Sequence, residues 1–453
     1  MTETPMRRPG PTSAPRNAPP PRPPRPVRDE APRQAARRAP APRRPAPKAP
    51  PAPMFFRKAG PVNGGFVATL LVLVVFGLLM LFSASTASAF YKFGDSFYYI
   101  RSQALYAALG LGVMWAVSRV DYHWLRQFTW PLYGVVLILL VVVIATCDPI
   151  NGCRRWLYWE GVRLPTVQVS EIAKFSMILC TAHLFEKYKN RVKGFQYGVL
   201  APAVLLVPVL VLLVFEPHYS AMVLMCCITA AMMFCGGTGL GWFGAGLVAA
   251  GGGGAWFLMT RMDYVQERLA GWLDPFSDVL DSTHQTAQSL YTIGSGGLFG
   301  VGLGNSVQKH LWLPEAQNDF IFSVLCEELG FVGALLCILL FALLLVQGIV
   351  IAVRSPDRFG SLLVVGVMAQ VGFQFMFNVA VVTNTVPNTG ISLPFFSSGG
   401  TSLLLLLGEM GVVLSVCRAG NKKRAEQRAA EAEERARQAG RAPQEKTVFH
   451  AGR

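Results

Sequence analysis

Long apolar runs recur between residues 66 and 417, and each is close to the length that a helix needs to cross a membrane. A span takes about 20 mostly apolar residues, and its backbone groups must find their hydrogen bonds within the segment. The chain is 52% hydrophobic and 15% charged, which excludes an ordinary soluble protein. We therefore expect an all-α polytopic membrane protein with about ten transmembrane helices. The expected spans are 66–85, 101–118, 129–146, 168–185, 197–215, 218–235, 240–259, 320–349, 359–383 and 401–417.

The distribution of Lys and Arg predicts the orientation of these spans. Basic residues collect in the cytoplasmic segments of membrane proteins. Here they occupy the N-terminal tail, alternate short loops and the C-terminal tail. An even number of spans then places both termini in the cytoplasm. It also makes 260–319, between the seventh and eighth helices, the one large extracytoplasmic loop.

The two tails differ in composition from the membrane region. Residues 1–58 are rich in Pro, Arg and Ala and predict a disordered cytoplasmic tail, because they cannot bury enough apolar surface to offset the entropy of ordering. Residues 59–417 are expected to form the ten-helix membrane domain, and 418–453 a charged cytoplasmic tail. The formal charge of +15 is concentrated in the tails, so it does not indicate a nucleic-acid partner.

The expected outer loop at 147–166 departs from the charge rule, because it contains Arg154, Arg155 and Arg163. An anionic ligand would explain this cluster, but short loops sometimes break the rule, and topology alone does not separate the two. The same loop holds Cys147 and Cys153. They could form a disulfide outside the cytoplasm, and the sequence leaves that open.

Metal chemistry has little support in the sequence. Most of the nine cysteines lie in apolar runs, where a buried thiol is the usual role. The chain has no CxxC pair and no His cluster, so we predict no metal site.

Polar side chains inside the expected spans are few. Glu171 and Lys174 are three residues apart, so they share a helix face and can pair. Such a pair fixes helix packing or lines a charged cavity, and the arginines just outside the same helix favour the cavity. Gln370, Gln374 and Asn378 form one polar stripe, which favours hydrogen bonds between helices over ligand contact.

Two further groups of ionisable residues lie near breaks or turns of the spans. Pro217, between Glu216 and His218, interrupts an apolar stretch and predicts a hairpin, although transporters also use broken helices. Glu327 and Glu328 are adjacent, so they cannot face the same way.

The segment 288–330 combines a run of glycines with Asp319 at the start of an apolar helix. A nucleotide-binding loop is excluded, because no strand precedes the glycines and no GK[ST] follows them. The glycines instead indicate tight backbone packing. Spacing alone favours Asp319 as a helix N-cap, and a carboxylate that meets a sugar hydroxyl at the outer surface is the alternative.

Four blocks of sequence resemble the SEDS family of bacterial cell-wall polymerases, which includes FtsW, RodA and SpoVE. They are FGLLMLFSAS (76–85), RRWLYWEGVRLPTVQVSEIAKF (154–175), QSLYTIGSGGLFGVGLGNSVQKHLWLPEAQNDFIFSVLCEELG (288–330) and NVAVVTNTVPNTGISLPFFSSGGTSLL (378–404). The resemblance covers about residues 60–417, and the GVGLGNS form is more similar to the FtsW branch than to RodA.

The sequence departs from the family pattern at two places. The family often has Pro-Asp-Leu-Gly at the break between the fifth and sixth spans, where this chain has Pro217-His218-Tyr219-Ser220. It usually has Ser-Tyr-Gly-Gly where this chain has Ser397-Ser398-Gly399-Gly400. Neither an acidic role at the break nor an aromatic hydroxyl in the last motif can therefore be carried over.

The resemblance implies a peptidoglycan glycosyltransferase that polymerises lipid II at the outer face of the bacterial cytoplasmic membrane, at the division septum. Its catalytic aspartate falls on Asp319, which would act as the base. Arg154, Arg155 and Lys309 are candidates to clamp pyrophosphate, and Glu171 and Lys174 would shape the cavity. The matched blocks add three further substrate-binding candidates, namely Glu315, Ser397 and Ser398.

The implied partners are a class B penicillin-binding transpeptidase and other division-complex proteins. A divalent cation, Mg²⁺ or Mn²⁺, could assist at the pyrophosphate. A lipid II flippase, a pure scaffold for the division machinery, and an elongation or sporulation member of the same family are the alternatives.

Overall fold

The computed structural model describes residues 60–147, 156–157, 167–246, 252, 269, 271–280 and 283–439. Helices dominate them. The first group is α1 (Gly64–Phe93), α2 (Tyr98–Val117), the 3₁₀ turn η1 (Tyr122–Trp124), α3 (Leu125–Thr146), α4 (Val169–Lys187), the π-helical turn η2 (Gln196–Leu200), α5 (Ala201–Phe215) and α6 (Tyr219–Cys235). The second group is α9 (His284–Ser295), α10 (Ile321–Val353), α11 (Arg358–Val382) and α12 (Gly400–Ala439).

Nine of the ten expected spans coincide with a helix in the described part of the chain. Seven helical segments there are long and apolar enough to cross a membrane, and α6 is a shorter apolar helix. The remaining expected span, 240–259, is described and helical only over 240–246 and at residue 252. The chain is thus a helical, multi-pass membrane protein.

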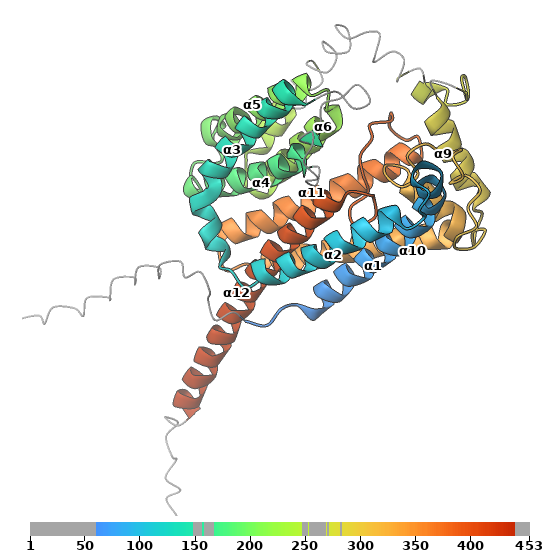
Figure 1. Ribbon diagram of the computed structural model, residues 1–453. Coiled ribbons are helices and arrows are strands. Elements are labelled where there is room, and N and C mark those ends of the chain that lie inside the picture. The colour runs from blue at the N-terminus through green and yellow to red at the C-terminus, as the bar shows by residue number, and fades with distance from the viewer. Residues whose placement is uncertain are drawn as a thin grey trace, which may run out of the picture. The chain divides into compact units, whose positions relative to one another are not determined.

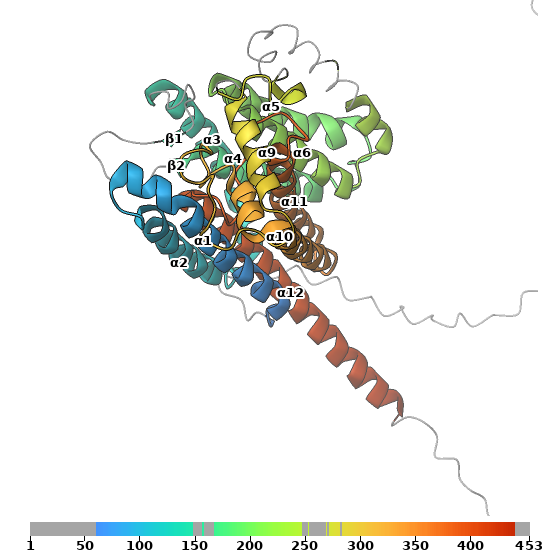
Figure 2. The same cartoon turned by 90° about the vertical axis from the view of Figure 1, so that its right-hand side faces the viewer.

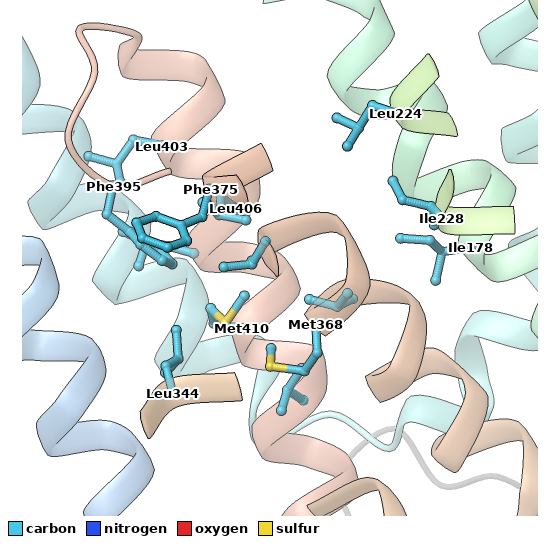
Figure 3. Close-up of a cluster of buried hydrophobic side chains, with 14 of the residues drawn as sticks. Ile178, Leu224, Ile228, Leu344, Met368, Phe375, Phe395, Leu403, Leu406 and Met410 are labelled. Carbon is cyan, nitrogen blue, oxygen red and sulfur yellow. The ribbon is translucent and has the colours of Figure 1, made fainter. Parts of the chain in front are cut away.

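Helix α11 lies at the centre of the described helices. It packs against α10, α6, α4 and α12, while α12 packs along α2 (Figures 1 and 2). Figure 3 shows how apolar side chains fill these contacts, with Met368 and Phe375 of α11 in the same cluster as Ile178 of α4, Leu344 of α10 and Met410 of α12. The surrounding lipid is itself apolar, so the hydrophobic effect does not drive these helices together. Close van der Waals packing of this kind holds them instead.

Hydrogen bonds to helix ends fix where the spans begin. Asn63 Oδ1 accepts the backbone N–H of Gly65 at 3.1 Å and so caps α1. Asp357 caps α11 by accepting from the Gly360 N–H at 2.7 Å, and it also contacts His123 Nε2 at 2.5 Å. These side chains satisfy backbone donors that a helix terminus leaves unpaired.

The last apolar span and the charged segment after it form one continuous helix. Helix α12 runs from Gly400 to Ala439 without a break, and its side chains are exposed from residue 425 to residue 436. Its end extends beyond the other helices in both views (Figures 1 and 2).

Two short strands lie in the described parts of the segment between α3 and α4. Strand β1 (Trp156–Leu157) pairs antiparallel with β2 (Val167–Gln168), directly before α4. Arg154, Arg155, Arg163 and Cys153 lie outside the described residues, so neither the arginine cluster nor the pairing of Cys147 with Cys153 is tested.

Candidate functional site

Asp319 lies in a turn that leads into α10, and its side chain is partly buried. The helix begins at Ile321, and the N-cap position belongs to Phe320, whose side chain makes no capping hydrogen bond. Asp319 therefore precedes the N-cap position by one residue, and the cap that spacing favoured is not the arrangement seen. Its carboxylate lies close to the segment between α11 and α12, because a Cβ on Gly390 would be 3.1 Å from Asp319 Oδ2.

The segment between α11 and α12 is hydrogen-bonded to the Asp319 turn. The hydroxyl of Ser397 donates to the Asn318 carbonyl at 2.7 Å and accepts from the Leu393 N–H at 2.7 Å. The Ser398 N–H donates to the Gln317 carbonyl at 2.9 Å. The structure thus brings Ser397 and Ser398 beside Asp319, and the contacts seen there run through backbone groups of the turn.

Glu315 lies on the same turn, beside a cavity of about 170 Å³. Its Oε2 accepts from Asn318 Nδ2 at 2.6 Å, and its backbone has a positive φ of 52°. Such a φ is uncommon for a non-glycine residue and costs about 1 kcal/mol or more. The cavity has both charged and polar walls, formed in part by Ser88, Lys92, Lys309, Glu315 and Gln317.

Lys309 sits in a buried ion pair. Its Nζ lies 3.0 Å from Glu328 Oε1, 3.2 Å from Ser83 Oγ and 2.6 Å from the Gly304 carbonyl. The side chains of Lys309 and Glu328 are only 4% and 0% exposed. An ammonium group has three N–H donors, and these three contacts use all of them. This geometry favours holding the glycine segment to α1 and α10 over binding a phosphate.

Glu327 and Glu328 face different partners, as expected for neighbours on a helix. Glu328 accepts the Ser83 hydroxyl at 2.6 Å, whereas Glu327 accepts the Ser306 hydroxyl and, at 3.0 Å, the Val307 N–H. Both glutamates are therefore anchors for the segment that follows α9.

Helix α10 is broken at Gly330, where φ is 65° and ψ is −167°. The glycine-rich segment fills the break: the Val301 and Gly302 N–H groups donate to the carbonyls of Glu327 and Glu328 at 2.9 and 3.0 Å. The Phe331 N–H donates in turn to the Gly297 carbonyl at 3.0 Å. A Cβ on Gly300 would lie 2.1 Å from the Glu328 carbonyl oxygen. Tight backbone packing is thus confirmed as the role of this glycine.

A second polar cluster lies inside the bundle. Lys174 Nζ and Glu171 Oε2 are 2.8 Å apart and buried, so the predicted pair forms. Glu409 of α12 is close enough to interact electrostatically with both, and its Oε2 accepts from Gln370 Nε2 at 3.0 Å. The sequence interpretation missed Glu409. A lone carboxylate in the run Leu403–Val413 was the signal that could have identified it.

The polar stripe on α11 joins this interior cluster to the Asp319 turn. Gln370 contacts Glu409, and Asn378, eight residues further along the helix, contacts the Asp319 carbonyl at 2.7 Å. Eight residues of helix correspond to about 12 Å. The expectation that these amides bond between segments is borne out for these two.

In the described parts of the chain, no group of three or more His, Cys, Asp or Glu side chains is arranged to hold a metal ion.

Known proteins resemble this chain over most of its length. It is 39% identical over 367 residues to stage V sporulation protein E of Bacillus subtilis, covering 81% of this chain and 99% of that protein. It is 37% identical over 351 residues to the probable peptidoglycan glycosyltransferase FtsW of Coxiella burnetii, covering 76% and 93%.

Two solved structures share the fold. One is a chain from a peptidoglycan synthase complex, with a TM-score of 0.67, 27% identity, and coverage of 79% of this chain and 98% of that one. The other is the rod shape determining protein RodA of Thermus thermophilus, with a TM-score of 0.58, 27% identity, and coverage of 79% and 97%. A family model described as "Cell cycle protein" matches residues 65–422. This chain therefore belongs to the FtsW/RodA/SpoVE family of cell cycle proteins.

Proposed function

We propose that this protein is a peptidoglycan glycosyltransferase that polymerises lipid II at the outer face of the cytoplasmic membrane during septal wall synthesis. One observation carries the proposal: a carboxylate, Asp319, stands two residues before a membrane helix, directly after a turn whose residues 313–317 line a polar cavity. The relatives named as peptidoglycan glycosyltransferases support the reaction class.

The reaction needs a base, an acceptor hydroxyl and a leaving group. Asp319 takes the proton from the 4-hydroxyl of the acceptor sugar, while the oxygen of that hydroxyl attacks the anomeric carbon of the donor. The bond from that carbon to the pyrophosphate oxygen breaks, and undecaprenyl pyrophosphate leaves with the electron pair. Because the new charge develops on phosphate, a cation must face it, and Arg154 and Arg155 are the proposed clamp.

The remaining candidates have supporting roles in this proposal. Glu315 lines the polar cavity, while Ser397 and Ser398 hold the segment between α11 and α12 to the Asp319 turn. Glu171 and Lys174 maintain the interior cluster. Lys309 holds the glycine segment in place. A class B penicillin-binding transpeptidase is the proposed partner, in line with the peptidoglycan synthase complex that contains a similar chain.

The test is glycan polymerisation from purified lipid II with the cognate transpeptidase present. Asp319→Asn should make no polymer while still folding and binding its partner. Asp95→Asn is the matched control, because Asp95 is a loop carboxylate paired with Arg101 at 2.8 Å on an exposed surface. It should polymerise as the wild type does. Equal activity in Asp319→Asn and the wild type would remove Asp319 as the base.

Transport of lipid II across the membrane is the second candidate. It is favoured by the buried Glu171–Lys174 pair and by the break between α5 and α6 at Pro217. Flipping predicts that Glu171→Gln abolishes movement of lipid II in liposomes and that Asp319→Asn does not. Polymer formation by the wild type, with no transport, would exclude this alternative.

A further inference from the structure

Asn378 occupies a singular position between the two segments that enclose Asp319. It lies on α11, and its side chain is fully buried, with 0% exposure. Its Nδ2 donates to the backbone carbonyl of Asp319 at 2.7 Å and to the backbone carbonyl of Ile391 at 2.7 Å. One amide therefore joins the turn before α10 to the segment between α11 and α12.

The orientation of this amide is determined by its surroundings. An amide NH₂ has two hydrogens, and both are used by the two carbonyls. A flipped amide would present its oxygen to two other oxygens, which is repulsive. The Oδ1 atom is buried and has no hydrogen-bond partner among the described residues. Among the described residues, the two N–H bonds are therefore the only hydrogen bonds that hold this side chain.

These bonds are placed next to the reacting carboxylate. On one side, Asn378 donates to the backbone carbonyl of Asp319 itself. On the other side it donates to the carbonyl of Ile391, which follows Gly390 in the chain. A Cβ on Gly390 would lie 3.1 Å from Asp319 Oδ2. Gly390 has a positive φ of 66°. The clearance around the carboxylate therefore depends on how closely these two segments are held.

We infer that Asn378 is a positioning residue for the Asp319 carboxylate, acting by clamping the Asp319 turn to the Ile391 segment. This inference rests on the proposed polymerase function. Because Asn378 is buried and donates to two backbone carbonyls, we expect its loss to change the geometry of the base and not contacts to sugar or pyrophosphate. A displacement of about 1 Å at a reacting group costs on the order of 10²-fold in rate.

The experiment measures both catalysis and local order in the full chain with its transpeptidase, using purified lipid II. Asn378→Leu removes both hydrogen bonds, and Asn378→Asp keeps the shape while retaining at most one of them. Each should lower kcat by about 10²-fold and change KM by less than about threefold. Hydrogen exchange of the backbone amides in 311–320 and 386–399 should become faster in both.

Gln347→Leu is the matched control, because Gln347 is also a helix amide that bonds between helices, to Thr69 Oγ1 at 3.3 Å, away from Asp319. It should leave kcat and exchange in both segments unchanged. Unchanged exchange in the Asn378 variants would overturn the inference, as would a raised KM with normal kcat. If the wild type makes no polymer, the proposed function fails. Faster exchange in the variants would then still support the clamp. Asn378→Asp preserves the test if Asn378→Leu does not fold.

Discussion

Removing Lys309 should destabilise the fold strongly. Lys309→Met leaves the Glu328 carboxylate, which is 0% exposed, without the ammonium group that lies 3.0 Å from it. Two unit charges at that distance attract by about 5.5 kcal/mol at an effective dielectric constant of about 20. Breaking a buried pair by removing one partner typically costs about 3–5 kcal/mol, because the other charge stays uncompensated. We expect a loss of that size in the free energy of unfolding.

A second variant separates the charge effect from the loss of a side chain. Lys309→Met combined with Glu328→Gln removes both charges and leaves the Ser83 hydroxyl a carbonyl to which it can donate. Because no buried charge is then uncompensated, the double variant should recover at least about 2 kcal/mol of the loss. Lys422→Met is the matched control. It breaks an exposed Lys–Glu pair at 3.8 Å, which should cost under about 0.5 kcal/mol.

Unfolding in mixed micelles, with the SDS fraction varied, measures all four proteins under one condition. Polymerisation of lipid II is then assayed at a temperature where each remains folded. A Lys309→Met protein with wild-type stability and no polymerase activity would refute the reasoning, and would return Lys309 to the role of a pyrophosphate ligand.

Three further predictions rest on other contacts described above. Gly300→Ala should destabilise the chain, because its Cβ would lie 2.1 Å from the Glu328 carbonyl oxygen at a φ of 78°. Gly294→Ala should leave stability unchanged, because a Cβ there meets open space. Equal melting temperatures for the Gly300→Ala and Gly294→Ala proteins would contradict this reasoning. Glu409→Leu should cost about 1–3 kcal/mol by leaving Gln370 Nε2 unpaired, whereas Glu409→Gln retains an acceptor; unfolding curves that coincide would remove the argument. Burial raises the pKa of Asp357, but hydrogen bonds from His123 and the Gly360 N–H outweigh it and hold the pKa below its usual value. Its stabilising effect is thus complete above an unfolded pKa of about 3.9 and is lost as pH falls through the lower folded pKa. Asp357→Asn should lower the melting temperature at pH 7 and flatten its decline in acid, and parallel pH curves would argue against this.

The helices were predictable because apolar length is a strong signal. A run such as 66–85 has few alternatives to a membrane helix, and α1 spans it. The pairing of Glu171 with Lys174 was equally accessible, since three residues on a helix place two side chains on one face. Local spacing determines both, so one sequence suffices.

Long-range contacts were not predictable in the same way. Nothing near Lys309 in the sequence identifies Ser83 and Glu328 as its partners, and they lie 226 and 19 residues away. Asp319 resembled an N-cap by position, but the helix starts two residues later. Whether a polar side chain binds substrate or another segment depends on neighbours that only the folded chain brings together.

The break at Gly330 divides α10 into a short arm, Ile321–Leu329, and a long one. The short arm carries the Asp319 turn at one end, and near its other end the Glu327 and Glu328 carbonyls accept from the Val301 and Gly302 N–H groups. The Gly297 and Leu298 carbonyls accept from the N–H groups of Phe331 and Val332 in the long arm. The loop therefore bridges the break and ties the short arm, with the Asp319 turn at its far end, to the long arm of α10. A substitution in 297–302 can consequently disable the enzyme by misaligning the proposed base, Asp319, although it lies at the opposite end of the arm and need not contact substrate.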